Sequence, residues 1–234
     1  MVQTLTVLDP VSDLARLEGV PSAIAAALAA VDLALGDRGH REIDHDQAGQ
    51  ALLDAARASA ALTEDPERWL PGVVRLYTEL AALSALVRIA PAQVLARAHA
   101  LAARDLVSVD DLGRPRPDPL VAARLDGLQQ VLTTRTEASA VLVGAVVHAE
   151  IAVVEPFGAG DGVVARAVEH MVLISAGVDP YGLISCEAGH LARRESYRTA
   201  LVGYRDGGAR GVRDWLLHCA AALADGATAA MQAR

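Results

Sequence analysis

The chain has 234 residues and a mass of 24.3 kDa, which is enough for one domain with a well-buried core. Its formal net charge of −8 and its pI near 5.3 argue against nonspecific binding to nucleic acid, because the mean field of the protein repels a polyanion. Hydrophobic residues make up 53% of the chain and aromatic residues only 3%, a composition that favours closely packed helices rich in alanine, leucine and valine.

The cysteines and the longest apolar run indicate the environment of the protein. Cys186 and Cys219 stand alone, without a Cys-x-x-Cys pair, so the sequence predicts neither a disulfide framework nor a metal site. We expect two structural thiols in a cytoplasmic protein. No basic segment leads into an apolar core at the N-terminus, so no signal peptide is expected. The apolar run at 22–35 contains Asp32 and is too short to cross a bilayer, so no membrane partner is predicted.

Apolar residues recur at helical spacing along almost the whole chain, which predicts an all-α fold. The predicted helices cover residues 21–36, 47–62, 71–89, 91–104, 121–132, 137–154, 163–176, 193–202 and 212–224. We divide the chain into an N-terminal helical extension at 1–46, a helical domain at 47–224 and a C-terminal tail at 225–234. Within the extension, His40 and His45 are expected to be solvated loop histidines, because nothing in the sequence fixes the geometry of a metal site there.

A glycine-rich stretch at 156–162 lies between two apolar helices, and the rest of the chain is organised around it. Its three glycines allow the backbone to approach a ligand closely. Free backbone amides and the positive end of the following helix favour a phosphate or a carboxylate at this point. A plain turn between two helices is the alternative. The predicted residues of an anion-binding or nucleotide-binding loop are Phe157, Gly158, Gly160, Asp161, Gly162 and Arg166.

This stretch resembles the signature of the Fic (Fido) family, whose members typically read His-Pro-Phe-x-(Asp/Glu)-Gly-Asn-Gly-Arg-x-x-Arg after a helix with a histidine seven residues upstream. The residues that match this pattern in register are His148, Pro156, Phe157, Gly160, Gly162 and Arg166. The residues that replace the signature histidine, acid, asparagine and first arginine are Glu155, Ala159, Asp161 and Val163. The resemblance therefore implies a Fic-like helical domain more strongly than it implies the activity of the family.

The resemblance also implies two features outside the signature. In many Fic proteins an inhibitory helix carries the pattern (Ser/Thr)-x-x-x-Glu, whose glutamate pairs with the second signature arginine. Here Ser59 matches the hydroxyl position, Thr63 occupies the glutamate position and Glu64 comes one residue later. A helix end with an incidental acid is the alternative. The irregular segment 105–119 lies where Fic proteins carry a short hairpin, or flap, that docks a target segment, although a plain loop of this length is also common.

Fic enzymes transfer AMP from ATP to a hydroxyl of a target protein, so the resemblance implies ATP and Mg²⁺ as cofactors. The signature histidine acts as the base, the acidic residue holds Mg²⁺, and the arginines offset the charge of the phosphates. Here Glu155 takes the place of the base. Glutamate is a weak base at pH 7, because its carboxyl ordinarily titrates near about 4.3. The four replacements also make the site more negative, and one repulsion between unit charges about 5 Å apart costs roughly 3 kcal/mol at an effective dielectric of about 20.

Three hypotheses follow for the function. In the first, which we adopt, the chain is a degenerate Fic-fold protein that lacks AMP transfer and acts through binding or protein interaction. In the second, it is a divergent Fic enzyme that transfers a nucleotidyl or phosphoryl group with Glu155 as base. In the third, it belongs to another class and uses the loop at 158–162 for a small ligand. We also expect Arg166 to pair with Glu155, Asp161 or Glu64, because a buried arginine is costly without a partner.

Overall fold

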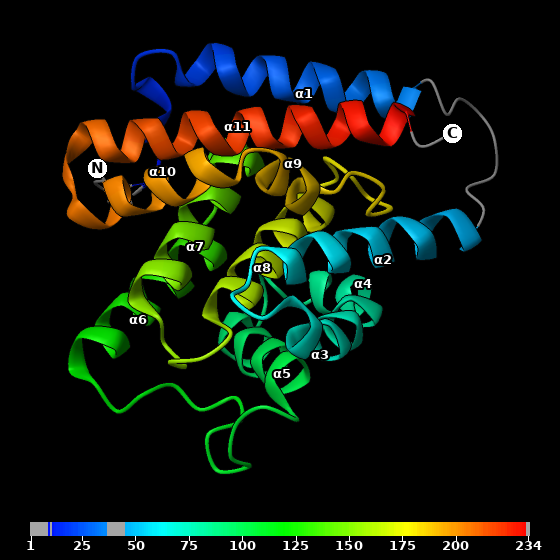
Figure 1. Cartoon of the computed structure of the whole chain (residues 1–234). Helices are drawn as coiled ribbons and strands as arrows, with labels where there is room; N and C mark the ends of the chain where they lie inside the picture. Colours follow the sequence, from blue (N-terminus) through cyan, green and yellow to red (C-terminus); the bar gives the residue numbers. More distant parts are fainter. Residues whose placement is uncertain (1–8, 10, 37–44, 233–234) are drawn as a thin grey trace, which may run out of the picture.

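A computed structural model describes residues 9, 11–36 and 45–232, and every regular element in these ranges is a helix (Figure 1). The predicted all-α fold is therefore confirmed. In chain order the helices are η1 (Leu14–Arg16), α1 (Val20–Gly36), α2 (His45–Ala61), α3 (Pro66–Thr78), α4 (Leu80–Ser84), α5 (Pro91–Ala103), α6 (Pro119–Thr133), α7 (Ala140–Val154), α8 (Asp161–Ser175), α9 (Cys186–Ala192), α10 (Arg194–Asp206) and α11 (Gly208–Gln232).

The two helices that flank the glycine-rich loop, α7 and α8, form the centre of the molecule (Figure 1). Both sequences are apolar almost all round, and such a helix is stable only when other elements cover it. Around α8 pack α4, α5 and α7, with further contacts from α2, α3 and α9. Val168, Val172 and Leu173 are accordingly buried, which confirms the prediction of two core helices joined by the loop.

The long helix α11 lies alongside α1 on one side of the molecule, and it also packs against α9 and α10 (Figure 1). It continues well beyond the predicted end at Ala224, and Gly226 and Ala227 are buried within it. The residues predicted as a tail are therefore helical as far as Gln232. The division of the chain into an extension and a separate domain stays a prediction, although α1 packs directly on α11.

Some predicted boundaries differ from the structure. The helix predicted at 71–89 is two helices, and the first begins at Pro66 instead of Pro71. Asp65 caps this helix, because its side-chain oxygen accepts a hydrogen bond from the backbone N–H of Arg68 at 3.2 Å. A proline at the first helical position loses no intrahelical hydrogen bond, so Asp65 and Pro66 together make a start signal that is stronger than Pro71.

The connection between α5 and α6 contains turns and no strand, so the predicted flap-like hairpin is wrong for this described segment. Two of its residues, Pro115 and Pro117, have no backbone N–H to donate to a strand ladder. The connection is held instead by separate bonds to the rest of the molecule. The N–H of Gly113 donates to Nδ1 of His99 at 2.9 Å, and the N–H of Arg116 donates to the carbonyl of Pro156 at 2.8 Å.

Three further expectations concern single residues and the membrane. Cys186 and Cys219 are buried and free, and burial raises the pKa of both thiols, as expected for structural cysteines. Within the described ranges no helix is long and apolar enough to span a membrane. The prediction for His40 lies outside the described residues, as does the side chain of His45.

Candidate functional site

The glycine-rich loop begins at the end of α7, where Glu155 adopts the left-handed backbone conformation. Glu155 has φ 49° and ψ 57° and caps the helix, with its N–H donating to the carbonyl of Ile151 at 3.0 Å. Residues with a side chain rarely adopt this conformation. The guanidinium of Arg116 donates to the carbonyls of Val154 and Glu155 at 3.0 and 2.9 Å, so a cation binds the negative end of α7. The Glu155 residue is exposed to solvent.

Asp161, the first residue of α8, lies inside the loop instead of facing a ligand. Its side chain is 6% exposed, and its Oδ1 accepts the backbone N–H of Phe157 at 2.8 Å. Burial, with help from the nearby charge of Glu155, raises the pKa of Asp161 to about 6, although backbone N–H groups of Phe157 and Gly158 act in the opposite direction. A backbone amide of the predicted anion loop is therefore already bound to a carboxyl group of the chain itself.

Aromatic rings pack against the loop at two points. A Cβ atom placed on Gly160, which has φ 73°, would lie only 2.6 Å from the Cη2 atom of Trp69, so the indole ring rests on the loop backbone. The Phe157 ring stacks on His99, with centroids 4.2 Å apart and an angle of 3° between the planes. His99 is fully buried, and burial lowers its pKa. His99 is therefore a hydrogen-bonded packing residue, which stacks on Phe157 and accepts the N–H of Gly113.

The position of Asp161 predicts a pH-dependent difference between the natural chain and Asp161→Asn. The pKa of this carboxyl rises on folding from an ordinary 3.8 to about 6, so the folded state holds the proton more tightly. The resulting stabilisation is complete below the unfolded pKa and is lost as the pH rises through the folded pKa. On lowering the pH from about 7.5 to about 5, we expect the natural chain to gain about 1 kcal/mol over the asparagine variant. Urea unfolding at both pH values measures this, and an equal change in the two proteins would contradict the burial of an ionisable carboxyl here.

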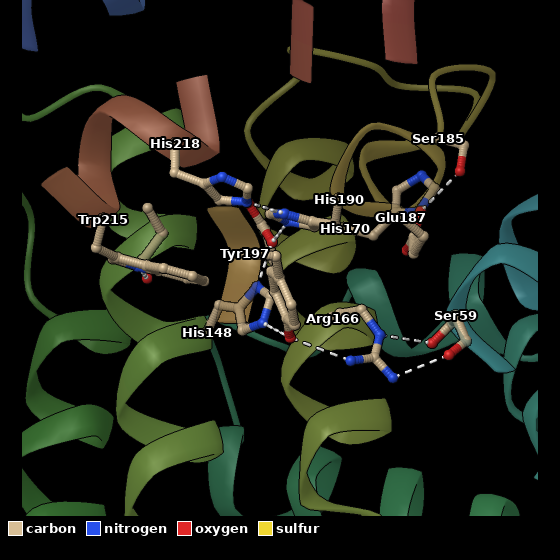
Figure 2. Close-up of polar contacts among 12 residues, drawn as sticks. Ser59, His148, Arg166, His170, Ser185, Glu187, His190, Tyr197, Trp215 and His218 are labelled. Carbon is tan, nitrogen blue, oxygen red and sulfur yellow. Dashed lines mark hydrogen bonds and ion pairs between the residues drawn. The ribbon is translucent and has the colours of Figure 1, made fainter. Parts of the chain in front are cut away.

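Arg166 of α8 stands at the position predicted to match the second arginine of the Fic pattern, and the residue is only 2% exposed. Figure 2 shows its guanidinium between Ser59 and Tyr197. Its Nε donates to the Ser59 hydroxyl at 2.9 Å, its Nη2 donates to the Ser59 carbonyl at 3.0 Å, and its Nη1 donates to the Tyr197 hydroxyl at 3.1 Å. A Cβ atom on Gly162 would lie 3.3 Å from Nη1, so the arginine also packs on the first turn of its own helix.

The prediction that Arg166 pairs with Glu155, Asp161 or Glu64 is wrong. No carboxylate of the described residues forms an ion pair with the guanidinium, whose hydrogen-bond partners are all neutral. The physical reason is that the three acids have other environments. Asp161 binds the amide of Phe157, whereas Glu155 and Glu64 are exposed to solvent.

The three predicted counterparts of an inhibitory pattern, Ser59, Thr63 and Glu64, have different environments in the structure. Ser59 is fully buried on α2 and contacts Arg166 through both its hydroxyl and its carbonyl. Thr63 and Glu64 follow the end of α2 at Ala61, and the Thr63 hydroxyl donates to the carbonyl of Ala60 at 2.6 Å. Helix α2 therefore contacts Arg166 where the inhibitory pattern was expected, but it does so through Ser59 and not through a glutamate.

Beside Arg166 lies a buried cluster of histidines around one glutamate, and sequence reasoning missed it (Figure 2). Oε2 of Glu169 lies 2.5 Å from Nδ1 of His148 and 2.9 Å from Nε2 of His190. The other ring nitrogens are also bonded, His148 Nε2 to the Tyr197 hydroxyl at 2.9 Å and His190 Nδ1 to His218 Nε2 at 3.0 Å. The signal in the sequence was that His148 and His218 fall on the apolar faces of predicted helices.

Burial controls the protonation of this cluster. Burial lowers the pKa of His148 to about 4 and, together with the adjacent His190, lowers the pKa of His218 to about 3, so both rings are neutral at pH 7. Burial by itself would raise the pKa of Glu169. Electrostatic interactions and hydrogen bonds with His190 and His148 outweigh burial and hold that pKa below its usual range. Glu169 is therefore a buried carboxylate between two imidazole rings.

A second buried group lies around Glu187 of α9. Its Oε1 accepts the hydroxyl of Tyr77 at 2.7 Å and lies 3.0 Å from Nδ1 of His170, while its Oε2 accepts the hydroxyl of Ser185 at 3.1 Å. Burial would lower the pKa of His170, but the charge of Glu187 outweighs it and raises that pKa. This ion pair joins α8 to α9, and Tyr77 links both to α3, so we regard the group as a structural connection between helices.

Comparisons with known proteins bear on the fold of the chain. No family model and no curated relative matches the sequence. Among solved structures, the crystal structure of a Fic family protein from Desulfovibrio desulfuricans G20 matches with a TM-score of 0.62 and 18% sequence identity. The match covers 90% of this chain and 74% of that protein. An identity this low supports the fold alone. The chain has a Fic-like fold.

Proposed function

We propose that the protein is a Fic-fold protein that does not transfer AMP to protein hydroxyls and acts through binding or protein interaction. The observation that carries this proposal is the hydrogen bond from the backbone N–H of Phe157 to the carboxyl of Asp161. A loop amide that a phosphate would use is thus engaged by an acidic side chain of the chain itself. An incoming nucleotide would have to displace Asp161 and would then face its negative charge.

The other replaced positions support the same proposal. Glu155 is an exposed carboxylate at the place of the base, and Ala159 has no oxygen to hold Mg²⁺. Val163 is 1% exposed within the packed interior, where the family pattern has an arginine. Of the two arginines in the family pattern only Arg166 remains, and it binds Ser59 and Tyr197 in this structure.

Calorimetric titration with Mg-ATP tests the proposal. We expect no binding by the natural chain at up to about 1 mM nucleotide, which corresponds to a binding free energy weaker than about −4 kcal/mol. The triple variant Glu155→His, Ala159→Asp, Asp161→Asn should bind at least about tenfold more tightly, because it removes two repulsive carboxylates and supplies a metal ligand. Val163 is left unchanged, since an arginine at a buried position would destabilise α8.

The single variant Asp161→Asn is the matched control. Because groups of one site act together, we expect it to gain far less affinity than the triple variant. Incubation of the natural chain with labelled ATP and Mg²⁺ should leave no label on protein. Binding in the micromolar range by the natural chain, or labelled AMP on any protein, would favour the divergent enzyme with Glu155 as base.

A further inference from the structure

Three side chains on three different helices converge in the buried cluster beside Arg166 (Figure 2). His148 comes from α7, Glu169 from α8 and His190 from α9, and one ligand atom of each lies within 4.8 Å of the other two. The two histidines are fully buried and the glutamate is 3% exposed. We propose that His148, Glu169 and His190 bind a divalent transition-metal ion of the zinc class.

The donor set decides the class of ion. Two imidazole nitrogens and one carboxylate oxygen match the preferences of zinc, which binds such ligands at about 2.0 to 2.2 Å in tetrahedral geometry. Magnesium and calcium prefer oxygen ligands, so two histidines disfavour them. The three side chains would fill three of four tetrahedral positions, and a water molecule or another small donor would supply the fourth.

Groups behind the ligands hold both imidazole rings in place. His148 Nε2 lies 2.9 Å from the Tyr197 hydroxyl, and His190 Nδ1 lies 3.0 Å from Nε2 of His218. Trp215 packs edge-on to the ring of His148 and stacks with the ring of His190, with centroids 5.0 and 6.2 Å apart. Metal-binding histidines in proteins have this arrangement, in which a partner at the second ring nitrogen fixes the orientation of the first.

A chain of hydrogen bonds from the surface inward leaves Nε2 of His190 free to face the proposed site. The hydroxyl of Ser196 donates to the carbonyl of Arg193 at 3.0 Å, so it accepts from Nδ1 of His218 at 3.1 Å. With that proton on Nδ1, Nε2 of neutral His218 accepts from His190 Nδ1. His190 Nε2 is then the ring nitrogen that faces the Glu169 carboxylate.

Metal binding in this network releases protons. The ion would lie among His190 Nε2, His148 Nδ1 and the Glu169 carboxylate, and any proton held between these groups passes to solvent. His148 would bind the ion through Nδ1 with its ring proton on Nε2, toward the Tyr197 hydroxyl. Because both ring nitrogens point to one oxygen atom of Glu169, the carboxylate has to shift to make room for the ion.

The second buried group offers a comparison within the same protein. His170, Cys186 and Glu187 also place ligand atoms within 4.8 Å of one another. There the glutamate already binds Tyr77, His170 and Ser185, and burial raises the pKa of the Cys186 thiol, which opposes the thiolate that a metal needs. His170→Gln is therefore a matched control, since it removes a fully buried histidine bonded to a buried glutamate outside the proposed site.

The experiment uses the full chain, purified without a histidine tag and freed of metal with a chelator. We expect about one Zn²⁺ per chain by elemental analysis after loading and removal of excess ion, with a rise in the melting temperature. The Co²⁺-loaded chain should show the intense visible absorption bands of a tetrahedral site. The variant His190→Gln should bind either ion at least about tenfold more weakly, whereas His170→Gln should bind as the natural chain does.

Three results would overturn the proposal. One is a natural chain that takes up neither Zn²⁺ nor Co²⁺ even when refolded in their presence, a readout that needs no variant to fold. Another is a folded His190→Gln protein, checked by circular dichroism, that keeps the stoichiometry and the absorption bands of the natural chain. A loss of metal from His170→Gln equal to that from His190→Gln would also overturn it, because the site would then lie elsewhere.

Discussion

Replacing Gly189 by alanine is expected to destabilise the protein by about 3 kcal/mol, because the added methyl group has no space and no flexible neighbour that can move away. A Cβ atom at this position of α9 would lie 1.8 Å from the carbonyl oxygen of Ala222 on α11. The atom that it meets belongs to the backbone of a buried helix, so relief requires separation of α9 from α11. Gly226 of α11 approaches the carbonyl of Ser185 in the same way, with a Cβ distance of 2.2 Å, so the two helices touch through glycines on both sides.

Gly127→Ala in α6 is the matched control. Gly127 is exposed within the helix, and a Cβ atom there would meet nothing within 4 Å. Since alanine favours helix over glycine, this variant should gain about 0.5 to 1 kcal/mol. Urea unfolding followed by circular dichroism gives both values. A Gly189→Ala protein with the stability of the Gly127→Ala protein would show that the close contact between α9 and α11 does not exist.

Replacing Trp215 by alanine is expected to cost about 4 kcal/mol, the largest loss that we predict for truncation of one side chain. Trp215 is fully buried on α11, and its Nε1–H donates to the carbonyl of Ala145 on α7 at 2.7 Å. Its ring lies against His148 and His190, so the variant leaves a cavity between the polar cluster and the core. The cost combines the lost burial of a large apolar surface, the cavity and a lost hydrogen bond.

Trp69→Ala provides the comparison, because these are the two tryptophans of the chain. Trp69 is only half-buried and rests on the loop at Gly160, so its truncation should cost roughly 1 to 2 kcal/mol, well below the loss at Trp215. Guanidinium unfolding of both variants, followed by far-UV circular dichroism, measures the difference. A smaller loss at Trp215 than at Trp69 would contradict the assignment of Trp215 to the core.

The all-α fold and the central pair of helices could be predicted because their signals are local. Apolar residues at helical spacing over 137–154 and 163–176 require burial nearly all round, whatever surrounds them. The loop between them could be predicted from Pro156 and its glycines, and the match to the Fic pattern depends on residues within one short stretch. Boundaries were less accurate where two prolines compete, as at Pro66 and Pro71 in α3.

The partner of Arg166 could not be predicted from the sequence. Glu155, Asp161 and Glu64 were all candidates, and the partner depends on which groups lie close to the guanidinium in the folded structure. Asp161 binds the amide of Phe157, and the partner that Arg166 finds is Ser59, which lies on a helix far away in the sequence. The sequence proposed Ser59 only through the resemblance. Its contact with the arginine results from the way α2 packs on α8.

Local sequence patterns were enough to predict that this chain is helical, that the helices now seen as α7 and α8 are buried and that a glycine-rich loop joins them, because periodicity and turn residues act over a few neighbouring positions. Which polar side chains meet inside depends instead on how the helices pack. His148, Glu169 and His190 lie on three helices, and nothing in their spacing shows that their ring nitrogens and carboxylate converge. Such contacts arise when helices distant in sequence pack together and leave each buried polar group to bind the partners that the packing brings within reach.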